Sequence, residues 1–389
     1  MPYLRAIVGN ASPYMLVTNA ATGRLKPYPA TLPPSTANGC AFSPDGALLA
    51  VAHYGSPYVT IYNTSDWSKV ADPATLPTSI ANGCAFSPDG ALLAVTHYNS
   101  PYVTIYNTSD WSKVANPATL PTYTANGCAF SPDGALLAVT HNYSPYITIY
   151  NTSDWSKVAN PATLPTSTAN GCAFSPDGAL LAVAHSSSPC VTIYNTSDWS
   201  KVANPATLPT YTANGCAFSP DGALLAVTHY YSPYVTIYNT SDWSKVANPA
   251  TLPTSTANGC AFSPDGALLA VTHNYSPYIT IYNTSDWSKV GDATPVSGST
   301  IAVSFVAADA LTIKGEVRDI DGLVASRKVR AYVRSSGDKC AETTSSAIDG
   351  TYELNVYEGN VEYDVQFMAA PLEDLNDLFY ARTTGGTVP

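Results

Sequence analysis

Short runs of hydrophobic and β-branched residues, separated by turn residues, fill the first three quarters of the chain. In one such stretch, CAFS at 84–87, ALLAVTH at 91–97 and YVTIYN at 102–107 predict three short strands. The SPDG sequence between the first two predicts a tight turn, because proline presets φ and glycine allows a positive φ. Apolar residues do not recur at helical spacing, so the pattern favours an all-β fold.

A fourth strand is expected after the TSDWS turn that follows. The segment from Lys113 to Leu120 predicts an outer strand, and Pro117 and Pro121 suit an edge, where a missing N–H faces solvent. Four strands in about 40–45 residues are typical of one blade of a β-propeller.

The unit repeats at a constant length. NGCAFSPDGALLAV recurs six times, and its cysteine moves by 44 residues each time. These cysteines are Cys40, Cys84, Cys128, Cys172, Cys216 and Cys260.

The two ends of the repeat array predict that the propeller closes on itself. Residues 4–33 align with residues 48–77 at the same offset of 44 but lack a first strand. The missing strand is found at residues 299–311, where Ser304 falls 44 residues after Cys260 and Asp309 falls 44 after Asp265. We therefore expect a seven-bladed β-propeller: six 44-residue repeats plus one blade shared by the N-terminal segment and residues 299–311.

Charge composition changes near residue 313. Residues 1–313 hold nine Lys/Arg, fifteen Asp and no Glu, whereas residues 314–389 hold eight Lys/Arg, seven Asp and all six Glu. We expect a propeller domain at 1–312 and a second domain at 313–389. In the latter, runs such as VRAYVRSS, TYELNVY and EYDVQF, with DG and EGN turns, predict a small β-sandwich.

Two resemblances follow from these motifs. FSPDGALLAV followed by YVTIYN resembles the core of WD-repeat propellers and of lactonase-like bacterial propellers, although the Gly-His and Trp-Asp pairs of WD repeats are absent. The second domain resembles the transthyretin-like, or carboxypeptidase-regulatory-like, β-sandwich (Ig-like in architecture). Its RKVRAYVR and DGTYEL segments and its ending through Arg382, Gly385 and Pro389 are similar to the end domain of tailed-bacteriophage structural proteins. The propeller resemblance implies a fold and does not by itself imply a function.

Overall charge and hydropathy exclude two classes of partner. The formal net charge is -11 and no basic stripe exists, which argues against nucleic-acid binding. No apolar run approaches the ~18 residues of a membrane helix, so no membrane insertion is expected. Leu4 already belongs to the first predicted strand, so we expect no signal peptide and synthesis in the host cytoplasm.

The cysteines and histidines predict structural roles. Blade faces pack ~10 Å apart, too far for disulfides between equivalent cysteines, and no CxxC motif indicates zinc. The histidines share one position at the end of the second strand; a ring of them could bind a metal or an anion, but we expect each to bond its own turn. Because no Ser/His/Asp set, paired carboxylates or phosphate loop is found, no catalytic residue, metal or cofactor is predicted. The histidines are His53, His97, His141, His185, His229 and His273.

Departures from the repeat gather at two positions, one after the histidine and one before the first strand. Both open on the same face of a blade, whereas the nearly invariant SPDG and TSDW turns open on the opposite face. Tyr, Asn and Ser are typical of adaptable binding surfaces, so we predict a partner-binding face; neutral drift in exposed turns is the alternative. The predicted contact residues are Tyr54, Tyr98, Asn99, Tyr123, Asn142, Tyr143, Tyr211, Tyr230, Tyr231, Asn274 and Tyr275.

Together these features favour a non-enzymatic structural component of a tailed-phage virion, as a tail, fibre, baseplate or decoration protein. The propeller would dock onto other virion proteins or recognise a host-surface glycan or protein, and a homo-oligomer could follow the particle symmetry. One alternative is a bacterial cell-surface or extracellular adhesion propeller. Another is a lactonase-like propeller enzyme, which would need an asymmetric acidic cluster or a bound metal in the central channel.

Overall fold

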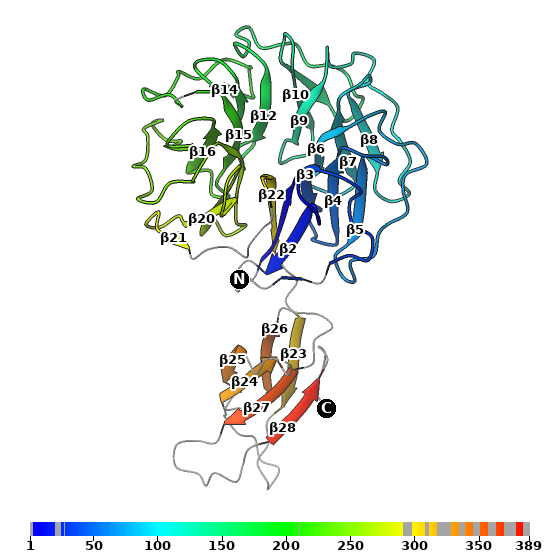
Figure 1. The fold of residues 1–389 in the computed structure, drawn as a ribbon, viewed down its shortest axis with the longest axis vertical. Coiled ribbons are helices and arrows are strands. Elements are labelled where there is room, and N and C mark those ends of the chain that lie inside the picture. Colours follow the sequence, from blue (N-terminus) through cyan, green and yellow to red (C-terminus); the bar gives the residue numbers. More distant parts are fainter. Residues whose placement is uncertain are drawn as a thin grey trace. The chain divides into compact units, whose positions relative to one another are not determined.

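The chain is all-β throughout the part that the structure describes (Figure 1). The computed structural model describes residues 3–19, 25–26, 28–209, 211–290 and 298–307, together with six strands between residues 311 and 383. None of these segments forms a helix long and apolar enough to cross a membrane. The chain divides into two compact units, residues 3–307 and residues 308–389.

Each repeat forms one antiparallel sheet whose first three strands follow chain order, and we number these sheets 1 to 6. The inner strands are β3 (Ala37–Phe42), β6 (Ala81–Phe86), β9 (Ala125–Phe130), β12 (Ala169–Phe174), β15 (Ala213–Phe218) and β18 (Ala257–Phe262). The middle strands are β4 (Leu48–His53), β7 (Leu92–His97), β10 (Leu136–His141), β13 (Leu180–His185), β16 (Leu224–His229) and β19 (Leu268–His273). The outer strands are β5 (Val59–Asn63), β8 (Val103–Asn107), β11 (Ile147–Asn151), β14 (Val191–Asn195), β17 (Val235–Asn239) and β20 (Ile279–Asn283).

The two ends of the first unit share a further sheet, which we call the closing sheet. Its strands run in the order β2 (Met15–Asn19), β1 (Tyr3–Gly9) and β22 (Thr300–Ala307). β22 pairs antiparallel with β1 and supplies the inner strand that the N-terminal segment lacks.

The inner strands stand side by side around the centre of the first unit (Figure 1). Contacts run from β3 through β6, β9, β12, β15 and β18 to β22, and from β22 back to β3. The sheets therefore close into a ring, and the first unit is a multi-blade β-propeller in which each sheet forms one blade.

An asparagine near the start of each inner strand joins neighbouring sheets. Asn38 occupies a bulge, because its neighbours Ala37 and Gly39 pair with β4 and Asn38 does not. The Nδ2 of Asn38 donates to the carbonyl oxygen of Ala81 in the next sheet at 2.9 Å. The same bond is made by Asn82, Asn126, Asn170, Asn214 and Asn258 at 2.7–2.8 Å.

Hydrophobic side chains fill the space between successive sheets. Between sheets 1 and 2, Val59 and Ile61 form one cluster with Leu93, Val95 and Tyr106. Equivalent clusters lie between the other sheets. Burial of such apolar surface, at roughly 25 cal/mol per Å², is the main attraction between blades.

The predicted fourth strand is largely absent from the described residues. In sheets 1 to 5 a single bridge, such as Tyr106 with Lys113, joins the outer strand to the following segment. Only in sheet 6 does the same pairing extend to a strand, the two-residue β21 (Lys289–Val290). Pro117 and Pro121 have no N–H to donate, so the segment that holds them cannot extend the ladder.

The closing strand lies one residue away from the predicted register. Ser304 pairs with Ala6 and Val303 with Ile7, so Val303 takes the position that Cys40 takes opposite Val51, and Ser304 does not. Close packing at the centre of the ring explains the shift. A Cβ added to Gly39 would lie 2.9 Å from the Cα of Gly83, and the shifted register places the small Ala302 at that glycine position. Asp309, the other residue in that alignment, lies outside the described residues.

The second unit contains two antiparallel sheets among its described strands. β23 (Leu311–Glu316) pairs with β26 (Thr351–Val356). The second sheet has the order β25 (Lys339–Thr344), β24 (Lys328–Val333), β27 (Tyr363–Met368) and β28 (Phe379–Thr383). The predicted β-sandwich and its transthyretin-like resemblance stay predictions, since the DG and EGN turns, Gly385 and Pro389 lie outside the described residues.

The closing sheet contains a buried cation at a position that is apolar in the repeats. Arg5 is 1% exposed and occupies the position equivalent to Leu49, and its Nε has no hydrogen-bond partner. No ion pair of Arg5 is found among the residues that the structure describes. Burial lowers the pKa of Arg5 to about 10, so the guanidinium stays charged at neutral pH and its burial costs stability.

We expect Arg5→Met to raise the free energy of unfolding of the propeller by about 1–3 kcal/mol, because an unpaired buried charge is replaced by an apolar chain of similar length. Leu49→Met is the matched control at the equivalent position and is expected to lower stability by less than about 1.5 kcal/mol. Chemical denaturation of both variants checks this. A less stable Arg5→Met protein would show that the guanidinium has a stabilising partner.

Val303→Asp should weaken ring closure. Val303 is buried against Ile7, Ile279 and Ile281, and a carboxylate there costs about 3 kcal/mol or more. Ala307→Asp, on the exposed end of the same strand, is the control and should leave the thermal unfolding midpoint unchanged. Equal midpoints for the two variants would contradict the observed register.

Candidate partner-binding face

The two variable segments of each repeat lie together at one end of its sheet. The turn after the histidine packs on the loop before the inner strand: in sheet 1, the backbone N–H of Tyr54 donates to Thr36 O at 2.9 Å. The N–H of Gly55 donates to the Oγ of Ser35 at 2.6 Å. We call this end of the propeller, with residues 34–36 and 53–58 and their equivalents, the tyrosine face.

The SPDG and TSDW turns lie together at the opposite end. The N–H of Thr64 donates to Ala47 O at 2.9 Å, and the Thr64 hydroxyl donates to Gly46 O at 2.5 Å. Asp45 accepts from the Ser43 hydroxyl at 2.6 Å and from the Ala47 N–H at 3.0 Å. These bonds lower the pKa of Asp45, and the same turn recurs in every repeat. We call this end the acidic face.

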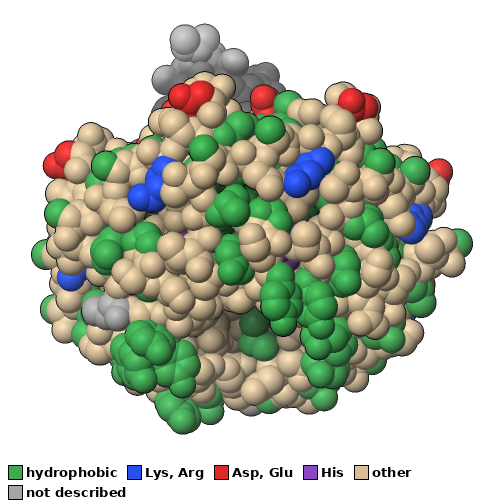
Figure 2. All heavy atoms as spheres, turned by 90° about the horizontal axis from the view of Figure 1, so that it is seen from above, with side chains coloured by type: hydrophobic (Ala, Val, Ile, Leu, Met, Phe, Trp, Pro, Cys, Tyr) green, Lys and Arg blue, Asp and Glu red, His purple; other side chains and the backbone are tan. Residues whose placement is uncertain are grey.

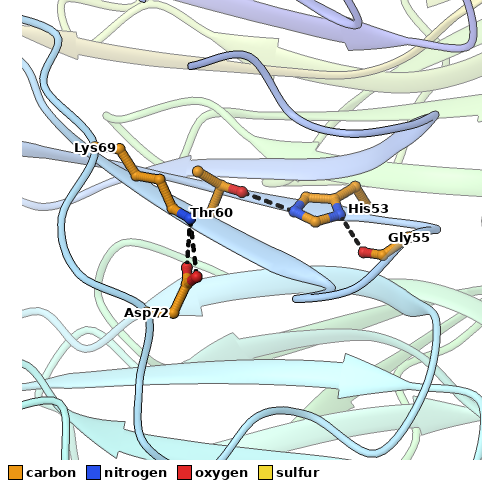
Figure 3. Close-up of polar contacts among 5 residues, drawn as sticks. All are labelled: His53, Gly55, Thr60, Lys69 and Asp72. Carbon is orange, nitrogen blue, oxygen red and sulfur yellow. Dashed lines mark hydrogen bonds and ion pairs between the residues drawn. The ribbon is translucent and has the colours of Figure 1, made fainter. Parts of the chain in front are cut away.

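A buried histidine anchors each turn of the tyrosine face (Figure 3). His53 Nδ1 lies 2.7 Å from Gly55 O, and its Nε2 lies 2.9 Å from the Thr60 Oγ1. Because a carbonyl oxygen only accepts, Nδ1 must donate, and Nε2 of the neutral ring accepts from the Thr60 hydroxyl. The Nε2–threonine contact is 2.9–3.0 Å in all six repeats. Each imidazole thus ties the turn to the outer strand.

Burial makes these rings poor proton carriers near neutral pH. It lowers the pKa of all six histidines to about 4, and in sheet 1 the charge on Lys69 acts in the same direction. Lys69 itself pairs with Asp72 at 2.8 Å near the outer edge of the sheet (Figure 3). Because this pair is partly exposed, it contributes at most about 1 kcal/mol.

All eight predicted tyrosines are exposed on the tyrosine face. Five of them lie in two clusters: three contact one another, and the other two form a cluster with Tyr102, which the sequence pattern did not single out. Cluster A comprises Tyr102, Tyr123 and Tyr143; the ring of Tyr123 is 6.1 Å from that of Tyr102 and 4.8 Å from that of Tyr143. Cluster B comprises Tyr211, Tyr230 and Tyr231, with centroids 5.0–6.4 Å apart. The eight tyrosines are Tyr54, Tyr98, Tyr123, Tyr143, Tyr211, Tyr230, Tyr231 and Tyr275.

Tyr54, Tyr98 and Tyr275 belong to neither cluster; no ring contact is found for them among the described residues. Tyr275 is the most exposed, at 71%. Each of these single rings offers contact area to a partner, but no neighbouring ring fixes its orientation as in a cluster.

The three predicted asparagines differ from one another in the structure. Asn99 is exposed, and its N–H donates to the Ser79 Oγ at 2.8 Å. Asn142 and Asn274 are half-buried, and their Oδ1 atoms accept from Asn126 and Asn258 at 2.8 Å. Asn142 and Asn274 therefore support the inner strands, and their amide oxygens are already engaged.

Sequence reasoning did not include Tyr102 among the contact residues. Tyr102 is the tyrosine of the SPY motif, which hardly varies between repeats, so comparison of the repeats with one another gave no signal. The structure shows that it stacks on Tyr123, which is present at that position in only two of the six repeats. Tyr102 could therefore be found only by considering this nearly invariant residue together with the variable Tyr123 of the next repeat.

The two faces differ in character (Figure 2). Figure 2 shows acidic side chains along one edge of the propeller and two groups of hydrophobic side chains at the opposite edge, with a hollow between them. Apart from Asp72, the exposed aspartates that the structure describes belong to the SPDG and TSDW turns, and the exposed aromatic rings belong mainly to the tyrosine face.

The cysteines line the inter-blade packing and make no disulfide among the described residues. The Sγ of Cys84 lies 3.7 Å from Ala50 O of the preceding sheet, and burial raises the pKa of this thiol to about 12. Such thiols are weak nucleophiles at neutral pH. In the described part of the chain, no group of three or more His, Cys, Asp or Glu residues is placed to hold a metal ion.

Comparisons with known proteins support the propeller. A family model described as "SMP-30/Gluconolactonase/LRE-like region" matches residues 63–248. Among solved structures, the chain is similar to hydrazine synthase of Kuenenia stuttgartiensis, with 19% identity and a TM-score of 0.59; the match covers 70% of this chain and 90% of that one. At this identity the likeness shows the fold alone. No curated protein matches the chain in sequence.

The buried histidines predict a loss of stability in mild acid. Their folded-state pKa of about 4 lies below the unfolded value of 6.5, so the unfolded chain takes up protons first as the pH falls. The histidine contribution to the free energy of unfolding should therefore be constant above pH 6.5 and fall between pH 6.5 and 4, with each histidine contributing up to about 1.4 kcal/mol per pH unit. Denaturant titrations of the full chain at a series of pH values measure this slope.

His97→Gln removes one of the titrating groups and is the matched variant. Its slope of unfolding free energy against pH between pH 6.5 and 4 should be smaller than that of the wild-type chain. The aspartates do not confuse this comparison, because their pKa values are lowered below 3.8 and they titrate at lower pH. A wild-type slope that the variant reproduces in full would show that the histidines do not cause it.

Proposed function

We propose that this chain is a non-enzymatic binding protein whose propeller presents the tyrosine face to a partner. The observation that carries the proposal is the gathering of eight exposed tyrosines on one end of the ring, five of them in clusters A and B. Tyrosine offers a large contact area at low entropic cost, and the clusters hold their rings in place before any partner binds.

The construction of this face supports the proposal. Each turn is held by a buried histidine and by a backbone hydrogen bond to the loop before the inner strand, as from His53 to Gly55 and from Tyr54 to Thr36. The exposed residues can therefore change while the scaffold stays the same. This separation of a rigid support from a variable surface is typical of recognition modules.

The virion assignment remains part of the proposal. It rests on the C-terminal motif with Arg382, and it gives the chain two kinds of partner: other virion proteins, and a glycan or protein on the host surface. A homo-oligomer that follows the particle symmetry belongs to the same proposal, as does the alternative of a cell-surface adhesion propeller.

A second candidate is an enzyme of the lactonase-like class, which the family match over residues 63–248 favours. This class would need carboxylates or histidines that converge near the centre of the ring. In the described residues, the histidines are bonded to their own turns and outer strands, as His53 is to Gly55 and Thr60, and the aspartates of the SPDG and TSDW motifs lie in turns of the acidic face. The arrangement therefore supports a binding protein better than a hydrolase.

Retention of the fluorescently labelled full chain on a broad panel of intact bacterial cells tests the proposal. Replacement of Tyr98, Tyr123, Tyr230 and Tyr231 by alanine should reduce retention on any cell that the wild-type chain binds by about tenfold or more, since such rings are typical hot-spot residues. All four side chains are exposed, so the fold is expected to survive.

The matched control is a fourfold Ala→Ser variant on the acidic face. It changes exposed turn residues and should bind like the wild-type chain. Unchanged retention of the tyrosine variant, or equal losses for both variants, would contradict the proposed role of the tyrosine face. The control residues are Ala47, Ala91, Ala135 and Ala179.

A further inference from the structure

Sheet 4 differs from both of its neighbours on the tyrosine face. Where sheets 3 and 5 carry Tyr123 and Tyr211 before the inner strand, sheet 4 carries Ser167. Its turn after the histidine has Ser186 and Ser187, and Cys190 replaces the tyrosine of the SPY motif. Small side chains thus occupy every variable position of this one blade. We call the region formed by these four residues the serine valley; Ser187 is exposed, Ser167 and Ser186 are half-buried, and Cys190 is buried at its base in the core.

Aromatic rings flank the valley on both sides. Tyr123 and Tyr143 of cluster A belong to sheet 3 and the loop that precedes it, and cluster B belongs to sheet 5 and the loop that precedes it. The ring contacts within each cluster hold these side chains together. The hollow between two hydrophobic groups in Figure 2 matches this order of large, small and large residues around the ring.

The valley supplies polar groups between the rings. Ser187 is exposed, and Ser186 accepts from Asn170 Nδ2 at only 3.3 Å, near the limit of a hydrogen bond. The Oγ of Ser167 has no hydrogen-bond partner, but it is buried, so the hydroxyls open to a ligand are those of Ser186 and Ser187. In sheets 2 and 6 the equivalent Ser79 and Ser255 accept a backbone N–H at 2.8–2.9 Å. Sheet 4 therefore has hydroxyl groups that its own fold does not use fully.

The absence of charged residues from these loops indicates which ligands the surface can bind. The loops that form the valley and its walls contain no Asp, Glu, Lys or Arg; they comprise residues 118–124, 142–146, 162–168, 186–190, 206–212 and 230–234. A surface without ionic groups offers no compensation for a charged ligand that loses its hydration. A neutral ligand with apolar faces and many hydroxyl groups fits better, which is the chemistry of an uncharged carbohydrate.

We propose that the serine valley and the two flanking clusters bind a neutral oligosaccharide. Sugar rings pack their C–H faces on the tyrosine rings of clusters A and B, and sugar hydroxyls exchange hydrogen bonds with Ser187 and Ser186 in the valley. The inference rests on the proposed function, because it names the ligand class of the tyrosine face. It also places the main sugar-binding subsite at sheet 4. The comparison of the repeats predicted no contact residue in this sheet.

Ser187→Tyr tests the valley with little risk to the fold. The equivalent residues Tyr143, Tyr231 and Tyr275 show that a tyrosine is accommodated at this position in three other repeats. The added ring should fill the valley and block the sugar between the clusters. Tyr211→Ala removes one wall instead, and Tyr28→Ala, which removes an exposed tyrosine that does not belong to the tyrosine face, is the control.

The probes are the hexasaccharides of glucose (β1,4 and α1,4), mannose and N-acetylglucosamine, with hexagalacturonate as an acidic comparison, titrated by calorimetry into the full chain. We expect at least one neutral probe to bind, with affinity about tenfold or more weaker for Ser187→Tyr and Tyr211→Ala and within about twofold of wild type for Tyr28→Ala. Tighter binding of hexagalacturonate than of every neutral probe would overturn the inference.

The cell-retention experiment separates this inference from the proposed function. If the fourfold tyrosine variant loses retention but no neutral probe binds the wild-type chain, the face recognises something other than a neutral glycan and only the inference falls. The same holds if a probe binds but Ser187→Tyr binds it equally well. If the fourfold variant keeps full retention, the proposed function falls as well.

Discussion

The close approach of the inner strands at the centre of the ring is the constraint on which the rest of the propeller depends. Each bulged asparagine donates to a carbonyl of the next sheet, and it can do so only because the following residue has little or no side chain. This bond repeats from sheet to sheet and ends at Thr300 of the closing strand. Since the links are short and equivalent, they fix the spacing of the blades and hence the positions of the loops at both ends.

The loops are spaced as regularly as the blades, but their sequences are nearly constant on the acidic face and variable on the tyrosine face. On the acidic face the same turn, held by a serine hydroxyl and an aspartate, is repeated almost without change. On the tyrosine face a histidine below each turn gives the same support, but the residues above it differ from blade to blade. Variation is thus found mostly at side chains that the scaffold does not need. The exceptions are Asn142 and Asn274, whose amides bond the inner strands, and the serines Ser35, Ser79 and Ser255, which accept a backbone N–H of the turn.

Much of the propeller follows from the sequence, because period-2 runs, turn residues and a constant repeat length all point to the same strands. Three features needed the structure. The fourth strand is short because the prolines in its segment have no N–H to donate to the β-ladder, and this outweighs the β-propensity of the residues around them. The register of β22 is set by the space beside Gly259, where a Cβ would lie 3.1 Å from Ile301 O. The clusters of the candidate site arise between neighbouring repeats, and a comparison of aligned positions within repeats does not show that Tyr102 lies beside Tyr123.

A chain of nearly identical repeats must also determine where its ring ends. Any middle strand of sheets 1 to 6 could pair with the inner strand of another repeat at almost the same energy, and only chain connectivity favours the native partner. The closing sheet does not share this ambiguity. Arg5 and Thr18 stand opposite each other where the repeats have leucine and tyrosine, and Ile301 and Ala302 stand where they have asparagine and glycine. A mispaired β1 or β22 would bring these residues against partners of the wrong size and polarity. The closing sheet, whose sequence differs most from the repeats, therefore determines how many blades the ring contains. The burial of the Arg5 charge is the energetic cost of this specificity.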